Sequence, residues 1–244
     1  MARRPGLTRM PLEAVSARLS KERKDQRDLY ARLSETSLDV ADPLAPLHQR
    51  YRVRVEKRER REEMGIAETA LGQLCAVAGV PAQFLERAPA SVGLDVMRSM
   101  LRLAQEGDDR QHLLRVKDGR SPRLRAVLPS SYVRLDDLDV LSEVERSAGV
   151  GWANAVNVWI TDDLFALRLV AGREVNLGSV QRPDPAQAGI DVVSSETGVR
   201  PLEIRSLLFR QVCANGMTRV VDSQRELRAR YARGDRAALR EVLR

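Results

Sequence analysis

The hydrophobic pattern changes its period partway along the chain. Between residues 66 and 106, apolar side chains recur at helical spacing, with Ala67, Leu71 and Leu74 on one stripe. Between residues 112 and 171, apolar and polar side chains mostly alternate with period two, which is typical of half-buried strands. Helices followed by hairpins predict an α+β fold, in which an antiparallel β-hairpin sheet packs with helices.

Capping and turn residues set the bounds of these elements. Gly79 ends the first helix, Pro81 starts the next, and Asp136 favours a helix N-terminus. Asp118-Gly119-Arg120-Ser121-Pro122 is a strong turn signal between two strands. Residues 201–213 are apolar, and their pattern does not separate strand from helix. We expect helices over 66–78, 81–88, 91–106 and 136–147, and strands over 51–55, 112–117, 123–128, 153–160, 164–171 and 188–194.

The two ends of the chain are basic. The net charge is +7, and residues 1–64 and 199–244 contribute +5 and +6, against −4 for the stretch between them. This pattern predicts an α+β core domain over 51–220, with helical N- and C-terminal extensions: a basic arm over 1–50 and a basic helix over 221–244. Two solvated helical flanks would give the same pattern. Within the arm we expect a surface helix over 12–34 and a linker over 39–48, and we expect the charged run 57–63 to lead into a helix.

The cysteine and histidine content and the hydropathy limit the cellular compartment and the metal sites that we expect. Cys75 and Cys213 are far apart in apolar contexts, which indicates two reduced thiols. With only His48 and His112 beside them, we expect no His/Cys metal site. No apolar run approaches the ~20 residues of a membrane span, and the basic start lacks the apolar stretch of a secretory signal. We therefore expect a cytoplasmic protein with no membrane partner.

A basic hairpin is the most informative local feature. Arg115 and Lys117 alternate with aliphatic residues on its first strand, as Arg123 and Arg125 do on its second, and Arg120 lies at the turn. Period-two geometry predicts the four strand cations on one face, opposite Leu124, Ala126 and Leu128. Like charges crowded there repel each other, and a phosphate backbone would relieve that repulsion. The alternative is an ordinary solvated sheet face.

Other candidate contacts for nucleic acid are scattered along the chain. Arg52 and Arg54 could extend the cationic surface, and Tyr132 could stack on a base. Arg210 could contact a phosphate near the Asn215-Gly216 turn, although Asn-Gly is also a plain turn signal. Trp152 and Trp159 are weaker stacking candidates. Aromatic residues are few, which favours a grip on the backbone over the reading of splayed bases.

Four short patterns occur in order between residues 79 and 216. They read Gly79-Val80-Pro81-Ala82-Gln83-Phe84-Leu85-Glu86-Arg87, then Arg125-Ala126-Val127-Leu128-Pro129-Ser130-Ser131-Tyr132 with Leu135-Asp136 after it, then Ser194-Ser195-Glu196-Thr197-Gly198, then Arg210-Gln211-Val212-Cys213-Ala214-Asn215-Gly216. Together they resemble elements of the phage- and plasmid-borne family called domain of unknown function 932. Pro129 replaces that family's usual Ser, and Ser194 its Asn. The resemblance implies a mobile-element setting and a polar constellation of Arg, Tyr, Asp, Asn and Gly.

These features favour a DNA-binding protein that handles single strands, as an annealing or DNA-recombination mediator would. We expect single-stranded nucleic acid as the partner, with DNA favoured, a homo-oligomer, and no cofactor, metal or catalytic residue. One alternative is a metal-dependent enzyme acting on nucleic acid or nucleotides, using Asp136, Asp137 or Asp162. Another is an interaction or inhibitor protein of phage or plasmid origin.

Overall fold

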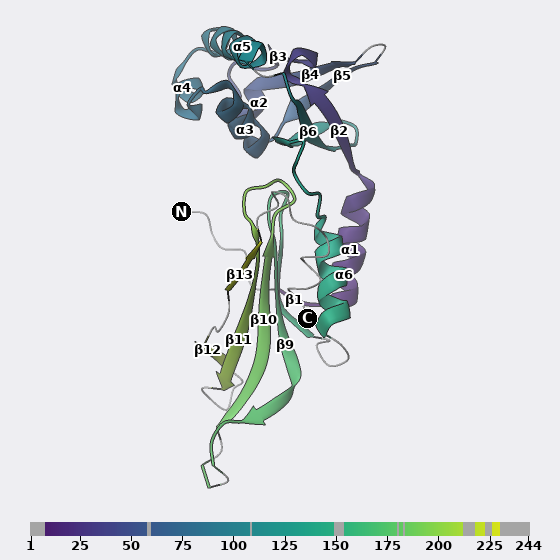
Figure 1. Cartoon of the computed structure of the whole chain (residues 1–244), viewed down its shortest axis with the longest axis vertical. Helices are drawn as coiled ribbons and strands as arrows, with labels where there is room; N and C mark the ends of the chain where they lie inside the picture. Colours follow the sequence, from purple (N-terminus) through teal and green to yellow (C-terminus); the bar gives the residue numbers. More distant parts are fainter. Residues whose placement is uncertain are drawn as a thin grey trace. The chain divides into compact units, whose positions relative to one another are not determined.

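The chain divides into two compact units. The computed structural model describes residues 8–57, 60–107, 109–148, 154–179, 181–182, 184–211, 218–222 and 226–229 (Figure 1). Unit 1 comprises Met1–Arg23 and Val133–Arg244, and unit 2 is the stretch Lys24–Tyr132 between them. The division differs from the expected core over 51–220, because much of the expected N-terminal arm belongs to unit 2.

Unit 2 is a six-stranded sheet with helices on one face (Figure 1). Its elements in chain order are β2 (Gln26–Arg32), the 3-10 turn η1 (Leu33–Glu35), β3 (Thr36–Val40), α2 (Leu47–Arg50), β4 (Tyr51–Lys57), β5 (Arg60–Ile66), α3 (Glu68–Ala78), α4 (Ala82–Arg87), α5 (Ala90–Gly107), β6 (Gln111–Lys117) and β7 (Arg123–Pro129). The strand order in the sheet is β2-β6-β7-β5-β4-β3, and neighbours are antiparallel except for β5 and β7, which are parallel.

Helices α3, α4 and α5 begin and end within two residues of the predicted bounds, whereas the short helix α2 was not predicted. Helix α3 stops at Gly79, whose φ of 67° is left-handed and whose N–H donates to the carbonyl of Ala76. Its inward stripe includes Leu71, Leu74 and Cys75, and Cys75 is a buried free thiol. These side chains form one hydrophobic cluster with buried apolar side chains from each of the six strands, which fixes the helices on this face of the sheet.

Helix α5 contacts the sheet closely because of a glycine. A Cβ on Gly93 would lie 2.5 Å from the hydroxyl oxygen of Tyr51, and that hydroxyl donates to the carbonyl of Ala90 at 3.4 Å. Tyr51 is 2 % exposed, and burial raises the pKa of its phenol above the ordinary value. The first residue of β4 is therefore anchored under α5.

Unit 1 is a second sheet accompanied by two helices. Its elements are β1 (Thr8–Pro11), α1 (Leu12–Lys24), α6 (Asp137–Ala148), β8 (Asn154–Ile160), β9 (Phe165–Asn176), β10 (Pro185–Ser194), β11 (Leu202–Gln211), β12 (Thr218–Asp222) and β13 (Glu226–Ala229). The strand order in the sheet is β1-β8-β9-β10-β11-β12, and β13 also pairs with β11. Figure 1 shows α1 and α6 side by side, and Arg23 on α1 pairs with Asp139 on α6 at 3.1 Å.

The α+β class and most elements agree with the sequence pattern, and four segments differ. The expected helix over 12–34 ends at Lys24, and β2 follows it. The charged run near residues 60–63 is part of strand β5, and the expected linker over 39–48 overlaps the end of β3 and the start of α2. Residues 202–211 are a strand, which resolves the ambiguous apolar stretch. The described parts of the expected C-terminal helix over 221–244, residues 221–222 and Glu226–Ala229, also lie in strands.

Candidate nucleic-acid interface

The basic hairpin forms, but its register shifts in the middle. Strands β6 and β7 pair from His112 opposite Pro129 to Lys117 opposite Arg123, with an irregularity between Arg115 and Val116. An extra residue in one strand reverses which face the following side chains occupy. Leu124 and Val127 therefore face the helices, whereas Ala126 and Leu128 form a separate cluster with Leu113, against which Tyr132 packs. The expected grouping of Leu124, Ala126 and Leu128 on one face is wrong.

Two of the four hairpin cations are buried. Arg115 is 3 % exposed and Arg125 is 4 % exposed. Arg115 lies directly opposite Asp28 on the neighbouring strand β2, and its Nε donates to the Asp28 carboxylate at 3.2 Å. A buried guanidinium is stabilised by such a partner, because its desolvation is otherwise costly. Arg115 and Arg125 thus do not line an open groove.

The other two hairpin cations belong to a row that crosses the sheet. Arg52 on β4 is opposite Gly65 on β5, Gly65 is opposite Arg123 on β7, and Arg123 is opposite Lys117 on β6. We call these four residues the cationic row. Side chains alternate between the faces of a sheet, so the row lies on the face away from the helices. The hydrophobic cluster under the helices contains the chain neighbours of all four, Val53, Ile66, Leu124 and Val116.

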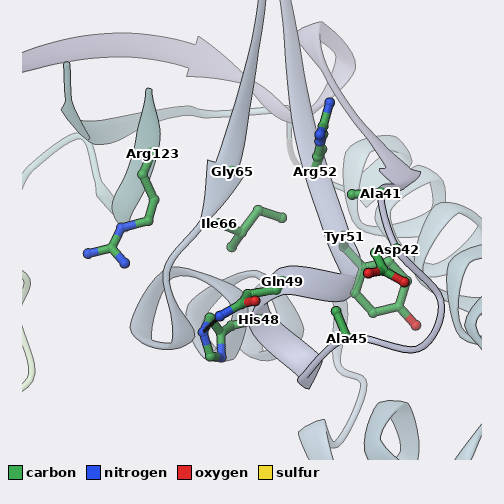
Figure 2. Close-up of a pocket in the computed structure, with 10 residues that line it drawn as sticks. All are labelled: Ala41, Asp42, Ala45, His48, Gln49, Tyr51, Arg52, Gly65, Ile66 and Arg123. Carbon is green, nitrogen blue, oxygen red and sulfur yellow. Dashed lines mark hydrogen bonds between the residues drawn. The ribbon is translucent and has the colours of Figure 1, made fainter. Parts of the chain in front are cut away.

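A pocket lies beside the cationic row. Figure 2 shows Arg123 on one side, Arg52 on the other, and His48 and Gln49 between them. Its volume is about 280 Å³, which is at the small end of sites for small molecules. The Gln49 amide nitrogen is 3.2 Å from Nε2 of His48. The complete lining is Ala41, Asp42, Ala45, His48, Gln49, Tyr51, Arg52, Gly65, Ile66 and Arg123.

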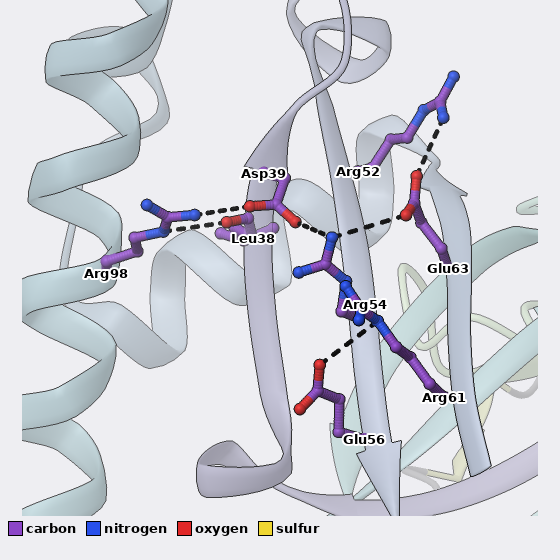
Figure 3. Close-up of polar contacts among 8 residues, drawn as sticks. All are labelled: Leu38, Asp39, Arg52, Arg54, Glu56, Arg61, Glu63 and Arg98. Carbon is purple, nitrogen blue, oxygen red and sulfur yellow. Dashed lines mark hydrogen bonds and ion pairs between the residues drawn. The ribbon is translucent and has the colours of Figure 1, made fainter.

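An ion-pair network occupies the same sheet face next to the pocket (Figure 3). Arg54 lies 2.7 Å from Asp39 and 3.7 Å from Glu63, and Arg52 donates to Glu63 at 3.0 Å. The hydrogen bond from Arg52 lowers the pKa of the Glu63 carboxyl. Arg52 and Glu63 are 56 % and 42 % exposed, so solvent screens their pair and Arg52 can exchange partners at small cost.

The other residues predicted to contact nucleic acid differ in exposure, and some lie outside the described residues. Arg120 is exposed in the hairpin turn, next to Gly119 with its φ of 147°. Tyr132 is half-buried against the small cluster on the hairpin, which limits it as a stacking platform. The side chain of Arg210 and the whole of Asn215, Cys213 and Trp152 lie outside the described residues.

Unit 1 contains a buried polar cluster that joins parts of two of the quoted patterns. Ser194 donates to the Asp137 carboxylate at 2.9 Å, and the backbone N–H of Asp137 donates to Glu196 at 2.9 Å. Thr197 donates to Asp163 at 3.1 Å. The two bonds with Asp137 tie the turn after β10 to the N-terminus of α6, where negative side chains are favoured, and the Thr197 bond ties it to the turn between β8 and β9. The Asp136–Asp137 pair thus has a structural role as a helix start.

Sequence reasoning missed the pocket. It identified Arg52 and Arg123 but not Gly65, Asp42 or Gln49, since β5 was expected to be the approach to a helix and the linker expected over 39–48 includes Asp42 and ends just before Gln49. The available signal was Met64 and Ile66 on either side of Gly65, which is a short period-two pattern.

Among the described residues, no group of three or more His, Cys, Asp or Glu side chains has an arrangement that could hold a metal ion. Within the same part of the chain, no helix is both long enough and apolar enough to cross a bilayer.

Comparison with known proteins gives no relative. No family model, no curated protein and no solved structure matches this chain.

Proposed function

We propose that this protein binds single-stranded nucleic acid, with DNA favoured, by gripping its phosphates with the cationic row of unit 2. The observation that carries the proposal is the alignment of Arg52, Arg123 and Lys117 across neighbouring strands on one face of a sheet. Two strand spacings separate Arg52 from Arg123, so their backbones are about 10 Å apart. Cations spaced along a surface in this way suit an extended polyanion better than a single ion.

The phosphate contacts that we propose lie away from the centre of the hairpin. Arg115 and Arg125 were expected to contact phosphates, but both are buried. Arg123 and Lys117 are half-buried, and Arg52 and Arg120 are exposed. The contacts that we propose are therefore Arg52, Lys117, Arg123 and, at the turn, Arg120. Annealing of complementary strands is the activity to examine once binding is established.

The test is fluorescence anisotropy of a labelled homopolymer single strand, titrated with the full chain at several salt concentrations. The logarithm of the binding constant should fall linearly with the logarithm of salt concentration, by about 0.7 for each phosphate neutralised. A double change, Arg52→Ala with Arg123→Ala, should weaken binding for every homopolymer and reduce that slope by about 1.4.

A matched control removes the same charge from the helix-covered side of unit 2. Arg87 on α4 and Arg102 on α5 are both exposed. Arg87→Ala with Arg102→Ala should leave the salt slope unchanged. Equal losses in the two double variants would mean that net charge alone drives binding, and absence of binding at low salt would refute the proposal.

A further inference from the structure

The cationic row has a gap in its middle. Gly65 has no side chain, yet its neighbours across the sheet on both sides are arginines. A Cβ built on Gly65 would meet only the Pro122 carbonyl oxygen at 3.8 Å and the Arg123 Cγ at 3.9 Å. These are ordinary contact distances, so packing does not require glycine there. The gap opens into the pocket that Gly65 lines (Figure 2).

The wall of the pocket is chemically mixed. Arg52 and Arg123 supply N–H donors from two edges, whereas Asp42 supplies a carboxylate, one oxygen of which accepts the Leu44 N–H at 3.0 Å. A phosphate beside Asp42 would be repelled by its charge. A neutral, flat group with both donors and acceptors on its rim avoids that repulsion, and a nucleobase is such a group.

We propose, on the basis of the nucleic-acid binding inferred above, that this pocket takes one unpaired base of the bound strand. The phosphates on either side of that base contact Arg52 and Arg123. The pocket volume of about 280 Å³ suits a single base and is too small for a base pair of a duplex. The protein therefore selects single strands, because a base inside a duplex cannot enter.

Each group in the pocket has a distinct task. Arg52 and Arg123 contact the two flanking phosphates from opposite edges of the pocket, and the groups between them contact the base. Asp42 accepts from a base N–H, and the exposed Gln49 amide offers both a donor and an acceptor. Tyr51 is too deeply buried to be a stacking platform, and it forms part of the pocket wall.

The experiment compares two labelled strands of equal length and charge, one with normal bases and one with abasic sugars throughout. Wild-type protein should bind the base-bearing strand about tenfold more tightly. Gly65→Val fills the gap without changing charge, and should reduce the preference for the base-bearing strand to less than twofold. Ser37→Val on β3, at a strand position on the same face outside the pocket, is the matched control and should keep the preference.

A second variant keeps the test informative if Gly65→Val fails to fold. Gln49→Ala alters an exposed side chain and should also reduce the preference for bases. Equal wild-type binding of the two strands would overturn the base pocket and leave the phosphate grip intact. Retention of the full preference by both Gly65→Val and Gln49→Ala would place the base elsewhere and overturn it too. Failure of both strands to bind would instead refute the proposed function itself.

Discussion

Strands β4 and β6 have the same alternation in sequence and opposite environments in the structure. In β4, Arg52 is 56 % exposed, and in β6 the side chain of Arg115 is 4 % exposed. Each arginine has a carboxylate partner on an adjacent strand, Glu63 and Asp28 respectively. Within these two strands the alternation therefore reveals which side chains share a face, but not whether that face is covered. Covered arginines should matter for stability, and open ones for binding.

The largest expected effect is at the covered arginine. Arg115→Ala leaves the Asp28 carboxylate, 9 % exposed, without its ion-pair partner on β6. Breaking a buried ion pair from one side costs about 3–5 kcal/mol. Urea denaturation should show a loss of that size in the free energy of unfolding. A loss as small as that expected at an exposed pair would show that solvent reaches this part of the sheet, and the contrast between the strands would fail.

A double change separates lost charge from lost shape at the same place. Arg115→Met with Asp28→Leu removes both charges and keeps apolar volume. Replacing a buried pair in this way is often neutral, so most of the stability lost in the single variant should return. Urea midpoints of the wild type, both single variants and the double variant give the coupling between the two residues. Additive losses would mean that the two side chains act independently.

An intermediate effect is expected at Arg54, which is 24 % exposed. Arg54→Ala removes its contacts with Asp39 and Glu63, but Asp39 keeps Arg98 at 2.6 Å and Glu63 keeps Arg52 at 3.0 Å (Figure 3). Since neither acid loses its last partner, the free energy of unfolding should fall by about 1 kcal/mol or less. Thermal unfolding measures this difference. A loss equal to that of Arg115→Ala would remove the distinction between covered and open arginines.

The smallest effect concerns pH. The pKa of Glu63 is lowered by its hydrogen bond from Arg52, so the unfolded chain takes up a proton at Glu63 before the folded chain does. The stabilisation is present above the ordinary glutamate pKa and is lost as pH falls through the lowered value. Glu63→Gln should therefore give a slightly shallower fall in unfolding midpoint on acidification. Glu86→Gln, at an exposed glutamate of α4, is the control.

Local signals in the sequence predicted most elements, and long-range pairing explains the failures. The helix ending at Gly79 and the hairpin over 112–128 were correct because caps, turns and periodicity lie within a few residues. Strand β2 was missed because it is stabilised by pairing with β6, more than eighty positions later in the chain. Its own pattern, with Arg27 and Asp28 beside Leu29, resembles a polar helix.

The candidate site was predictable only in part for the same reason. Arg52, Lys117 and Arg123 were identified from local alternation. Their common row depends on the parallel pairing of β5 with β7, which no short window contains. The burial of Arg115 and Arg125 could not be read from sequence, because it depends on what covers that part of the face.

The parallel pairing of β5 with β7 is the junction between two antiparallel parts of the unit 2 sheet. Two aligned pairs, Gly65 with Arg123 and Ile66 with Leu124, join the antiparallel ladder β3-β4-β5 to the ladder β7-β6-β2. The N–H groups of Gly65 and Ala67 donate across it to the carbonyls of Pro122 and Leu124 at 2.9 and 2.8 Å. A strand of nucleic acid that contacts Arg52 and Arg123 at the same time would bridge the two ladders and stabilise the pairing of β5 with β7. By mass action it would then slow amide hydrogen exchange at Gly65 and Ala67 more than at the ladder amides on either side.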